Sequence, residues 1–281
     1  MLNTSQKIFL KSVNRQLFNP TTIKHHRFDC HIATAKQCGT HWIKYMLSLV
    51  LCQIHDLPLP AHIMEDSVVG HPRTAAKYTH IPQIAVTHSH PHYLLHIPSV
   101  IDVLHLPRYL VMVRDPRDIL VSAYEKAKGE YLSKVLDVPH EVEFSEFLRA
   151  SMDIKKPFAD IWSIILFFND WGPVLSRHPN KTNFVRYEDM KADTAAQMHR
   201  ICDFIGIAGA TEAVIAAAIE NSSRDKMKKK LNPDEDQKEK SVNLKIRNFK
   251  EWYSPQDRQF VDDIFTKHLK YDYGYNLQDW D

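Results

Sequence analysis

The sequence predicts an α/β fold, a single domain with a central parallel sheet flanked by helices. Short β-prone runs alternate with longer helical patterns, which is typical of a parallel sheet with helices on both faces. The β-prone runs are mostly apolar, as expected for strands buried on both sides. The predicted strands are residues 30–34, 84–87, 109–113 and 183–186, and the predicted helices begin near Thr40, Pro116, Ser145, Ala159, Ala192, Thr211 and Pro255.

The bulk properties exclude several classes of protein. The 281 residues are enough for one large α/β domain or two small ones. A formal net charge of +2 makes a nucleic-acid coat or a polybasic membrane patch unexpected. No run approaches the roughly 18 apolar residues of a membrane span, and the N-terminus lacks a secretory signal. The four cysteines have neither CxxC spacing nor a disulfide framework, which favours a reducing cytoplasm.

No low-complexity linker divides the chain. We expect one domain over residues 29–275, with an N-terminal extension at 1–28 and a C-terminal tail at 276–281. Residues 224–246 are highly charged and poor in large apolar side chains. Such a run is either a solvated surface loop or a mobile lid over a polyanionic ligand, and the sequence favours neither alternative.

The loops that follow the strands are the expected binding region, because ligands of parallel sheets bind at the carboxyl ends of the strands. After the first strand, Gly39 permits close approach of a ligand. Thr40 can cap a helix whose N–H groups suit an anion. A Walker phosphate loop requires Gly followed by Lys. None of the seven glycines is followed by lysine, so a small-molecule kinase of the P-loop type loses most of its support.

A histidine leaves the second predicted strand. His88 can act as a general base near neutral pH. Because His90, His92 and His96 follow it, these four residues could instead bind a transition metal, or be structural. No Asp or Glu lies between residues 66 and 102 to complete a common hydrolase site, which disfavours a metal hydrolase.

The third loop has the sequence of a capped helix start. Asp115 suits the N-cap, Pro116 the first helical position, and Asp118 can reach back as in a capping box. This arrangement leaves the guanidinium of Arg114 free to bind a phosphate, with the hydroxyl of Ser122 two turns farther on. The alternative is an Arg114 paired with one of the two aspartates.

Taken in order, these segments resemble the sulfotransferase family that uses 3'-phosphoadenosine 5'-phosphosulfate (PAPS). Residues 38–42 (CGTHW) are similar to its phosphosulfate loop, typically PKSGTTW, and residues 113–118 (VRDPRD) to its 3'-phosphate motif. His88 lies where the family has its catalytic histidine. Residues 187–190 (YEDM), 222–228 (SSRDKMK) and 247–252 resemble three further family segments, so the match covers about residues 30 to 270.

The resemblance implies a P-loop-like sulfotransferase fold in a cytoplasmic enzyme. It implies transfer of a sulfuryl group from PAPS to a hydroxyl or amine of a small-molecule acceptor, with PAP as product and no metal. His88 would be the general base, and Lys36 would stabilise the leaving oxygen, because the family's loop lysine aligns with Gln37. The implied donor-binding residues are Gln37, Cys38, Gly39, Thr40, His41, Trp42, Arg114, Ser122, Tyr187, Ser223, Arg224 and Arg247.

Departures from the family pattern leave alternatives open. Gln37 is compatible with a member that binds nucleotide but has weakened or no catalysis. Arg224 replaces the aromatic residue expected to pack on adenine, and its guanidinium plane could stack there instead. The dimerisation motif is poorly matched, so the oligomeric state stays open. The acceptor is equally open among phenols, steroids, sugars and amines.

Overall fold

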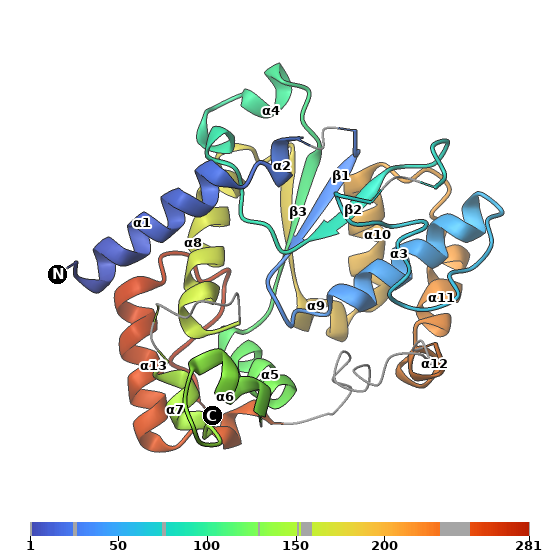
Figure 1. Cartoon of the computed structure of the whole chain (residues 1–281). Coiled ribbons are helices and arrows are strands. Elements are labelled where there is room, and N and C mark those ends of the chain that lie inside the picture. The colour runs from blue at the N-terminus through green and yellow to red at the C-terminus, as the bar shows by residue number, and fades with distance from the viewer. Residues whose placement is uncertain are drawn as a thin grey trace.

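The computed structural model describes residues 2–24, 27–74, 77–128, 130–150, 152, 159–230 and 248–280. Four parallel strands form a sheet in the order β2-β1-β3-β4 (Figure 1), which confirms the predicted fold class. Two strands begin one residue earlier than predicted. The strands are β1 (Cys30–Thr34), β2 (Ile84–Thr87), β3 (Arg108–Val113) and β4 (Thr182–Arg186).

The register brings the carboxyl ends of the strands to one edge. Ala33 of β1 is paired with Thr87 on one side and with Val111 on the other. Val113, the last residue of β3, is paired with Arg186, the last of β4. All residues of β1 and β2 are buried, as expected for strands covered on both faces. The four loops that follow the strands therefore start at the same level.

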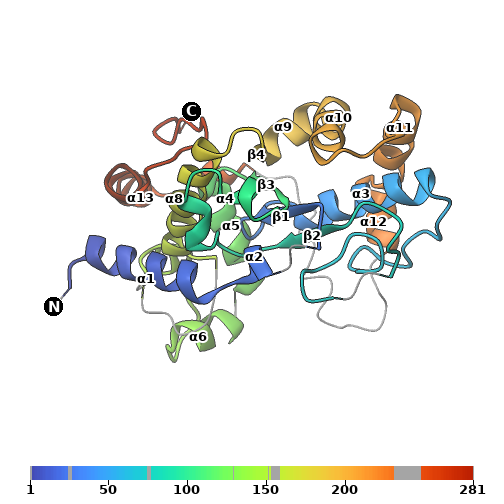
Figure 2. The same ribbon diagram turned by 90° about the horizontal axis from the view of Figure 1, so that it is seen from above.

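Helices lie on the two sides of the sheet in two groups (Figures 1 and 2). One group contains α3 (Thr40–Ile54), α10 (Thr194–Ile205) and α11 (Glu212–Asn221). The other contains α5 (Pro116–Ala127), α7 (Phe144–Leu148), α8 (Ile161–Arg177) and α13 (Pro255–His268). The start residues of α3, α5 and α13 are those predicted, and the other four lie within two residues of the prediction.

The remaining elements are short, apart from α1. They are α2 (Thr21–Lys24), η1 (Tyr93–His96), α4 (Val100–Val103), α6 (Glu130–Leu136), α9 (Tyr187–Ala192), α12 (Arg224–Lys229) and η2 (Phe249–Trp252). Helix α12 begins the charged stretch for which a lid or a solvated loop was expected. The rest of that stretch, from residue 231, lies outside the described residues.

The sequence prediction missed helix α1 (Thr4–Phe18) in the expected N-terminal extension. A capping box between Asn3 and Gln6 starts this helix, with both reciprocal hydrogen bonds at 2.9 Å. It lies at the edge of the molecule against α8 (Figures 1 and 2). Its inward side is polar: Ser12 Oγ donates to Asp170 Oδ1 at 2.5 Å, and Gln16 Nε2 donates to the same oxygen at 2.9 Å. Apolar periodicity therefore gave no signal for its packing face.

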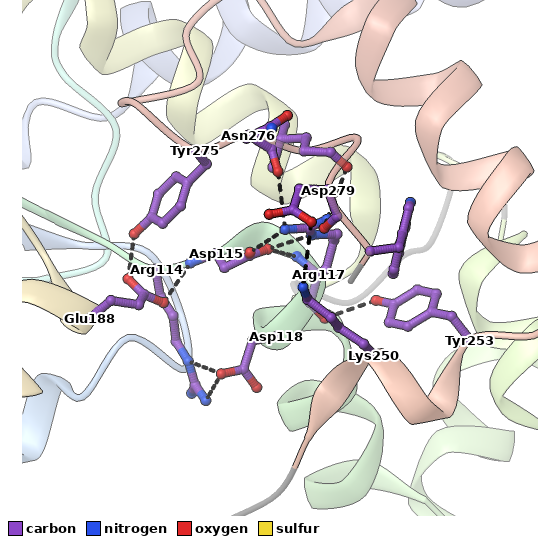
Figure 3. A network of polar contacts seen from close by, with 12 residues as sticks. Arg114, Asp115, Arg117, Asp118, Glu188, Lys250, Tyr253, Tyr275, Asn276 and Asp279 are labelled. Atoms are coloured by element: carbon purple, nitrogen blue, oxygen red, sulfur yellow. Dashed lines mark hydrogen bonds and ion pairs between the residues drawn. The ribbon is translucent and has the colours of Figure 1, made fainter.

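Arg117 holds the C-terminal residues against α5 (Figure 3). Its guanidinium, buried at 4% exposure, donates to both carboxylate oxygens of Asp115 at 3.0 and 2.7 Å. It also donates to the backbone carbonyls of Leu277 at 3.0 Å and Asp279 at 2.6 Å. The ring of Trp280 packs 4.8 Å from the same guanidinium. Residues 276–280, expected to form a tail, thus contact the domain, in large part through this buried cation.

Replacing Arg117 with Ala should lower the free energy of unfolding by about 3 kcal/mol, because the buried carboxylate of Asp115 loses its partner. Urea denaturation measures the loss. Arg73→Ala is the matched control, because Arg73 is exposed and should change stability by no more than about 0.5 kcal/mol. Equal midpoints for the two variants would contradict the anchoring role of Arg117.

Candidate active site

The turn between β1 and α3 is the centre of the site. Gln37 has φ +62° and Gly39 φ +80°, both in the left-handed region, so the chain reverses sharply between strand and helix. Gly39, and not Thr40 as predicted, is the N-cap residue of α3. The Thr40 hydroxyl instead lies 2.8 Å from the hydroxyl of Thr34 at the end of β1. That hydrogen bond fixes the first turn of the helix to the sheet edge.

Backbone donors at the start of α3 are open. Within the described part of the chain, the N–H groups of Gly39, Thr40 and His41 have no hydrogen-bond acceptor. Its N-cap residue, Gly39, has no side chain that could cap this end of the helix. Unpaired N–H groups at the positive end of a helix dipole form a ready site for an anion. The donor set fits the phosphosulfate end of a nucleotide such as PAPS.

His88 leaves β2 beside this turn and is oriented by it. Its Nδ1 lies 2.9 Å from the carbonyl oxygen of Thr34 and 3.0 Å from the Thr34 hydroxyl. Because a carbonyl oxygen can only accept, Nδ1 carries the hydrogen and donates it. The lone pair of the neutral ring is then on Nε2. The side chain is exposed, so the ring can meet a substrate from solution.

The surroundings keep His88 neutral. Removal of hydration by the neighbouring protein lowers its pKa below the ordinary value of 6.5. The hydrogen bond to Thr34 opposes this shift, while the positive charges of Lys36 and Lys126 add to it. A neutral imidazole with a lone pair on Nε2 is the form that can accept a proton.

Lys36 is half-buried and its charge acts on His88. Burial lowers the pKa of Lys36, and the nearby charges of Arg15 and Lys126 lower it further. The carboxylate of Asp160, 8% exposed, raises it. Asp160 itself caps α8 through a hydrogen bond from Ser163 N to Oδ1 at 2.8 Å. A cation and the general-base candidate thus share one corner of the sheet edge.

Arg114 contacts the same turn, but its guanidinium is not free as first expected. Nε donates to Asp118 Oδ2 at 2.9 Å and Nη2 donates to the same oxygen (Figure 3). Nη1 donates to the carbonyl oxygen of Gln37 at 2.8 Å. The Asp118 charge raises the pKa of Arg114 against the lowering effect of burial, the largest influence. Asp118 therefore pairs with Arg114, and Asp115 alone caps α5, accepting from Arg117 N at 2.9 Å.

Tyr187 closes the site from the β4 side. Its ring lies 4.7 Å from the Arg114 guanidinium and 6.0 Å from the ring of Trp42. A Cβ atom placed on Gly39 would meet this ring at 2.9 Å. Glycine is required there both for the positive φ and for the closeness of the tyrosine. The charge of Arg224, at the start of α12, lowers the pKa of Tyr187, although burial raises it more.

The other predicted residues lie as follows. Cys38 is buried, and burial raises its pKa well above the ordinary value, so its thiol is protonated. Ser122 is 3% exposed on α5, and Ser223 is the exposed N-cap residue of α12. His41 has a buried Nδ1 without a hydrogen-bond partner in the described part of the chain, and burial with the charge of Lys44 lowers its pKa to about 4. Arg247 lies outside the described residues.

Sequence reasoning missed two residues of this site. Thr34 binds His88 through both its carbonyl and its hydroxyl. Glu188 Oε1 accepts from Asp115 N at 3.0 Å, and Oε2 accepts from the Tyr275 hydroxyl at 2.6 Å (Figure 3). The position of Thr34 at a strand end was a usable signal. No sequence signal indicated the partners of Glu188, which come from distant segments.

Two histidines of the segment 88–96 form hydrogen bonds with other parts of the protein. His90 Nδ1 binds Asp170 Oδ2 at 2.7 Å and His96 Nε2 binds Gln16 Oε1 at 2.5 Å. In the residues that the structure describes, no group of three or more His, Cys, Asp or Glu side chains could hold a metal ion. Across the same residues, no helix has the length and apolar character needed to cross a membrane.

Residues 28–272 match the family model described as Sulfotransferase domain. The chain belongs to this sulfotransferase family. A flavonol sulfotransferase-like protein of Flaveria bidentis is 22% identical over 225 residues, 74% of this chain and 68% of the relative. Sulfotransferase 6B1 of Pan troglodytes is 22% identical over 178 residues, 63% of this chain and 55% of the relative. The second match thus covers only about half of the relative.

Two solved sulfotransferase-like structures share the fold. Mouse sulfotransferase SULT7A1 complexed with PAP has a TM-score of 0.56 and 18% identity, covering 95% of this chain and 90% of its own. Retinol dehydratase in a complex with retinol and PAP has a TM-score of 0.54 and 16% identity, covering 94% and 86%. At 16–18% identity these similarities show the fold of this chain. They do not show its substrates.

Gly39→Ala should cost about 1 kcal/mol more stability than Gly209→Ala. Both positions have nearly the same positive φ, +80° and +85°, so both variants carry similar backbone strain. At Gly209 the new Cβ meets Ile54 at an ordinary 3.4 Å, whereas at Gly39 it must displace Tyr187. Urea unfolding compares the two variants. Equal losses of unfolding free energy would show that Tyr187 does not restrict the side chain at position 39.

Proposed function

We propose that this chain is a PAPS-dependent sulfotransferase, of the EC 2.8.2 type, that sulfates a hydroxyl or amine of a small-molecule acceptor. The observation that carries the proposal is His88, held through Nδ1 beside the open N–H groups of α3. Related chains of the same fold have been solved with PAP, the product that sulfuryl transfer from PAPS leaves. When bound, PAPS supplies the sulfuryl group.

His88 is proposed as the general base. Its Nε2 accepts the acceptor's proton while the acceptor oxygen or nitrogen forms a bond to sulfur and the bond between sulfur and the phosphate oxygen breaks. Thr34 keeps Nε2 in the proton-accepting form by fixing the hydrogen on Nδ1. The lowered pKa of His88 supports this role, because the ring is neutral at physiological pH.

Lys36 and the turn are proposed to hold the transferred group. The N–H groups of Gly39, Thr40 and His41 donate to its oxygens, and Lys36 offsets the negative charge that develops on the leaving oxygen. Lys36 is proposed for this role because Gln37, which aligns with the family's loop lysine, has no charge. The charge of Lys36 already reaches this corner of the sheet edge, since it acts on His88.

Arg114 and Ser122 are proposed to bind the 3'-phosphate, with Arg247 as a further cation. An arginine has more N–H donors than the three that Arg114 uses on Asp118 and Gln37. It can therefore bind phosphate and still hold the turn. Trp42, Tyr187 and Arg224 are proposed to contact the adenosine. Cys38 and Ser223 are proposed to contact the nucleotide through their backbone.

The acceptor is proposed to be a small molecule. Retinol and androsterone were bound to a protein of the same fold, which supports an acceptor of this size. Phe144, Phe147, Phe167 and Phe168 belong to the buried core. Phe158 lies outside the described residues. Activity assays with a panel of phenols, sterols and amines identify the class of acceptor.

A second candidate is a protein that binds the nucleotide without transferring sulfate. Gln37, in the position of the family's loop lysine, favours it. Its left-handed φ of +62° and the engagement of its carbonyl by Arg114 leave the residue fixed in the turn. Such a protein would bind PAP in calorimetry while the wild-type chain releases no PAP from PAPS with any acceptor of the panel.

His88→Ala should lower the rate of sulfuryl transfer by about 10²–10⁴-fold, because a general base contributes that much. Calorimetric binding of PAP should be unchanged, since the imidazole does not hold the nucleotide. His199→Ala, on the outer helix α10, is the control and should retain full activity. Unchanged turnover in the His88 variant would remove this residue from the mechanism.

The acidic limb of the kcat/KM profile should lie below pH 6.5. Activity requires neutral His88, and a lowered pKa keeps the ring neutral to lower pH. Lys36→Gln removes a positive charge that lowers this pKa, so its limb should move toward higher pH, independently of any loss in kcat. Lys181→Gln, at a half-buried position paired with Asp102, should leave the limb in place. If the acidic limb of kcat/KM does not move in Lys36→Gln, the charge of Lys36 does not lower the pKa of His88.

A further inference from the structure

The two residues that follow His88 are both tied to helix α8. The carbonyl oxygen of Ser89 accepts from Trp171 Nε1 at 3.2 Å. His90 Nδ1 lies 2.7 Å from Asp170 Oδ2. Asp170 and Trp171 are neighbours on α8 and are 3% and 0% exposed, so both partners belong to the packed interior. The loop that carries the general-base candidate is therefore attached to α8 as well as to the sheet.

The contacts of His90 decide which of its ring nitrogens donates. Arg15 Nη1 lies 3.0 Å from Nε2, and a guanidinium can only donate, so Nε2 accepts. The hydrogen is then on Nδ1, which donates it to the carboxylate of Asp170. The other carboxylate oxygen, Oδ1, accepts from Ser12 and Gln16 of α1 at 2.5 and 2.9 Å. One carboxylate thus binds α1 through Oδ1 and the loop after β2 through Oδ2.

His88 depends on an attachment of this kind. Its two contacts with Thr34 meet at the same atom, Nδ1, so they fix one point of the ring. The direction of Nε2 depends also on where the backbone of residues 88–90 lies. Before His88, the backbone is held by the pairing of β2 with β1. After it, the contacts of Ser89 and His90 with α8 hold the chain.

We propose that Asp170 is a positioning residue for sulfuryl transfer, acting through His90 to keep Nε2 of His88 directed at the acceptor. This assignment rests on the proposed function, in which His88 is the general base. Position matters for a base because a displacement of about 1 Å can lower a rate by about 10²-fold. His90, which the sequence left open as a metal ligand or a structural residue, thereby has a role in the geometry of the site.

Two substitutions at His90 test the proposal, because replacing Asp170 itself would also release α1. His90→Ala removes the donor to Oδ2, while Ser12 and Gln16 still donate to Oδ1, so the protein should fold. We expect kcat to fall by about 10–100-fold, with the KM for PAPS and the calorimetric binding of PAP unchanged. His90→Asn places an amide donor near the position of Nδ1 and should restore most of the lost kcat.

Ser12→Ala is the matched control. It also takes one donor from Asp170, but on the side of α1, so it should change the urea midpoint about as much as His90→Ala and leave kcat unchanged. An equal fall of kcat in the two variants would overturn the proposal, because Asp170 would then act only on stability. Full kcat in His90→Ala, or no recovery in His90→Asn, would overturn it as well. So would a change confined to the KM of the acceptor, since His90 would then contact the acceptor directly.

A measurement without turnover separates this proposal from the proposed function. In nuclear magnetic resonance spectra of protein labelled with ¹⁵N-histidine, His88 should show one tautomer in the wild type, with the hydrogen on Nδ1. His88→Ala identifies its signals. In His90→Ala we expect exchange between the two tautomers, because the looser loop lets the ring leave Thr34. A wild-type chain that transfers no sulfate would contradict the proposed function, whereas an unchanged His88 spectrum in His90→Ala would contradict positioning by Asp170.

Discussion

The position of β1 between β2 and β3 is the constraint on which the site depends. Because neighbouring parallel strands end at one level, the turn after β1 is within reach of the loops on both sides. The β2 loop contributes His88, which binds the last residue of β1. From β3 comes Arg114, which binds the carbonyl of Gln37 in the turn. Tyr187, at the end of β4, packs against Gly39. Each loop contacts the turn or the strand end before it, so the end of β1 and its turn fix the mutual positions of the loops.

The segment Arg114–Asp118 connects this site to the C-terminus of the described chain. It contains two arginines and two aspartates, and the pairs cross: Arg114 binds Asp118, while Arg117 binds Asp115. The first pair faces the turn after β1, and the second holds the carbonyls of residues 276–279 (Figure 3). Glu188 reinforces the connection, because it accepts from both Asp115 N and the Tyr275 hydroxyl. Residues 276–280 thus support the loop that carries Arg114.

The sequence predicted the sheet well, and it also indicated where to look for a site, since both inferences depend on local patterns. Apolar runs locate strands, and polar residues after them locate the functional edge. Which aspartate pairs with Arg114 was not predictable, because Asp115 and Asp118 are both near in sequence and the choice depends on where the side chains point. The role of Thr34 required knowledge that β1 and β2 are neighbours. Helix α1 was not predicted because its packing face is polar. Apolar periodicity indicates only faces that pack through apolar contacts.

The polar inner face of α1 makes this helix part of the domain. Asp170 is buried on α8, and a buried carboxylate is unfavourable unless donors surround it. Two of the donors to Asp170, Ser12 and Gln16, belong to α1, and a third group, His90, follows two residues after His88. The helix is therefore held by the same loop that carries the general-base candidate. A helix fixed in this way through its polar side leaves Phe9, Leu10 and Leu17 exposed.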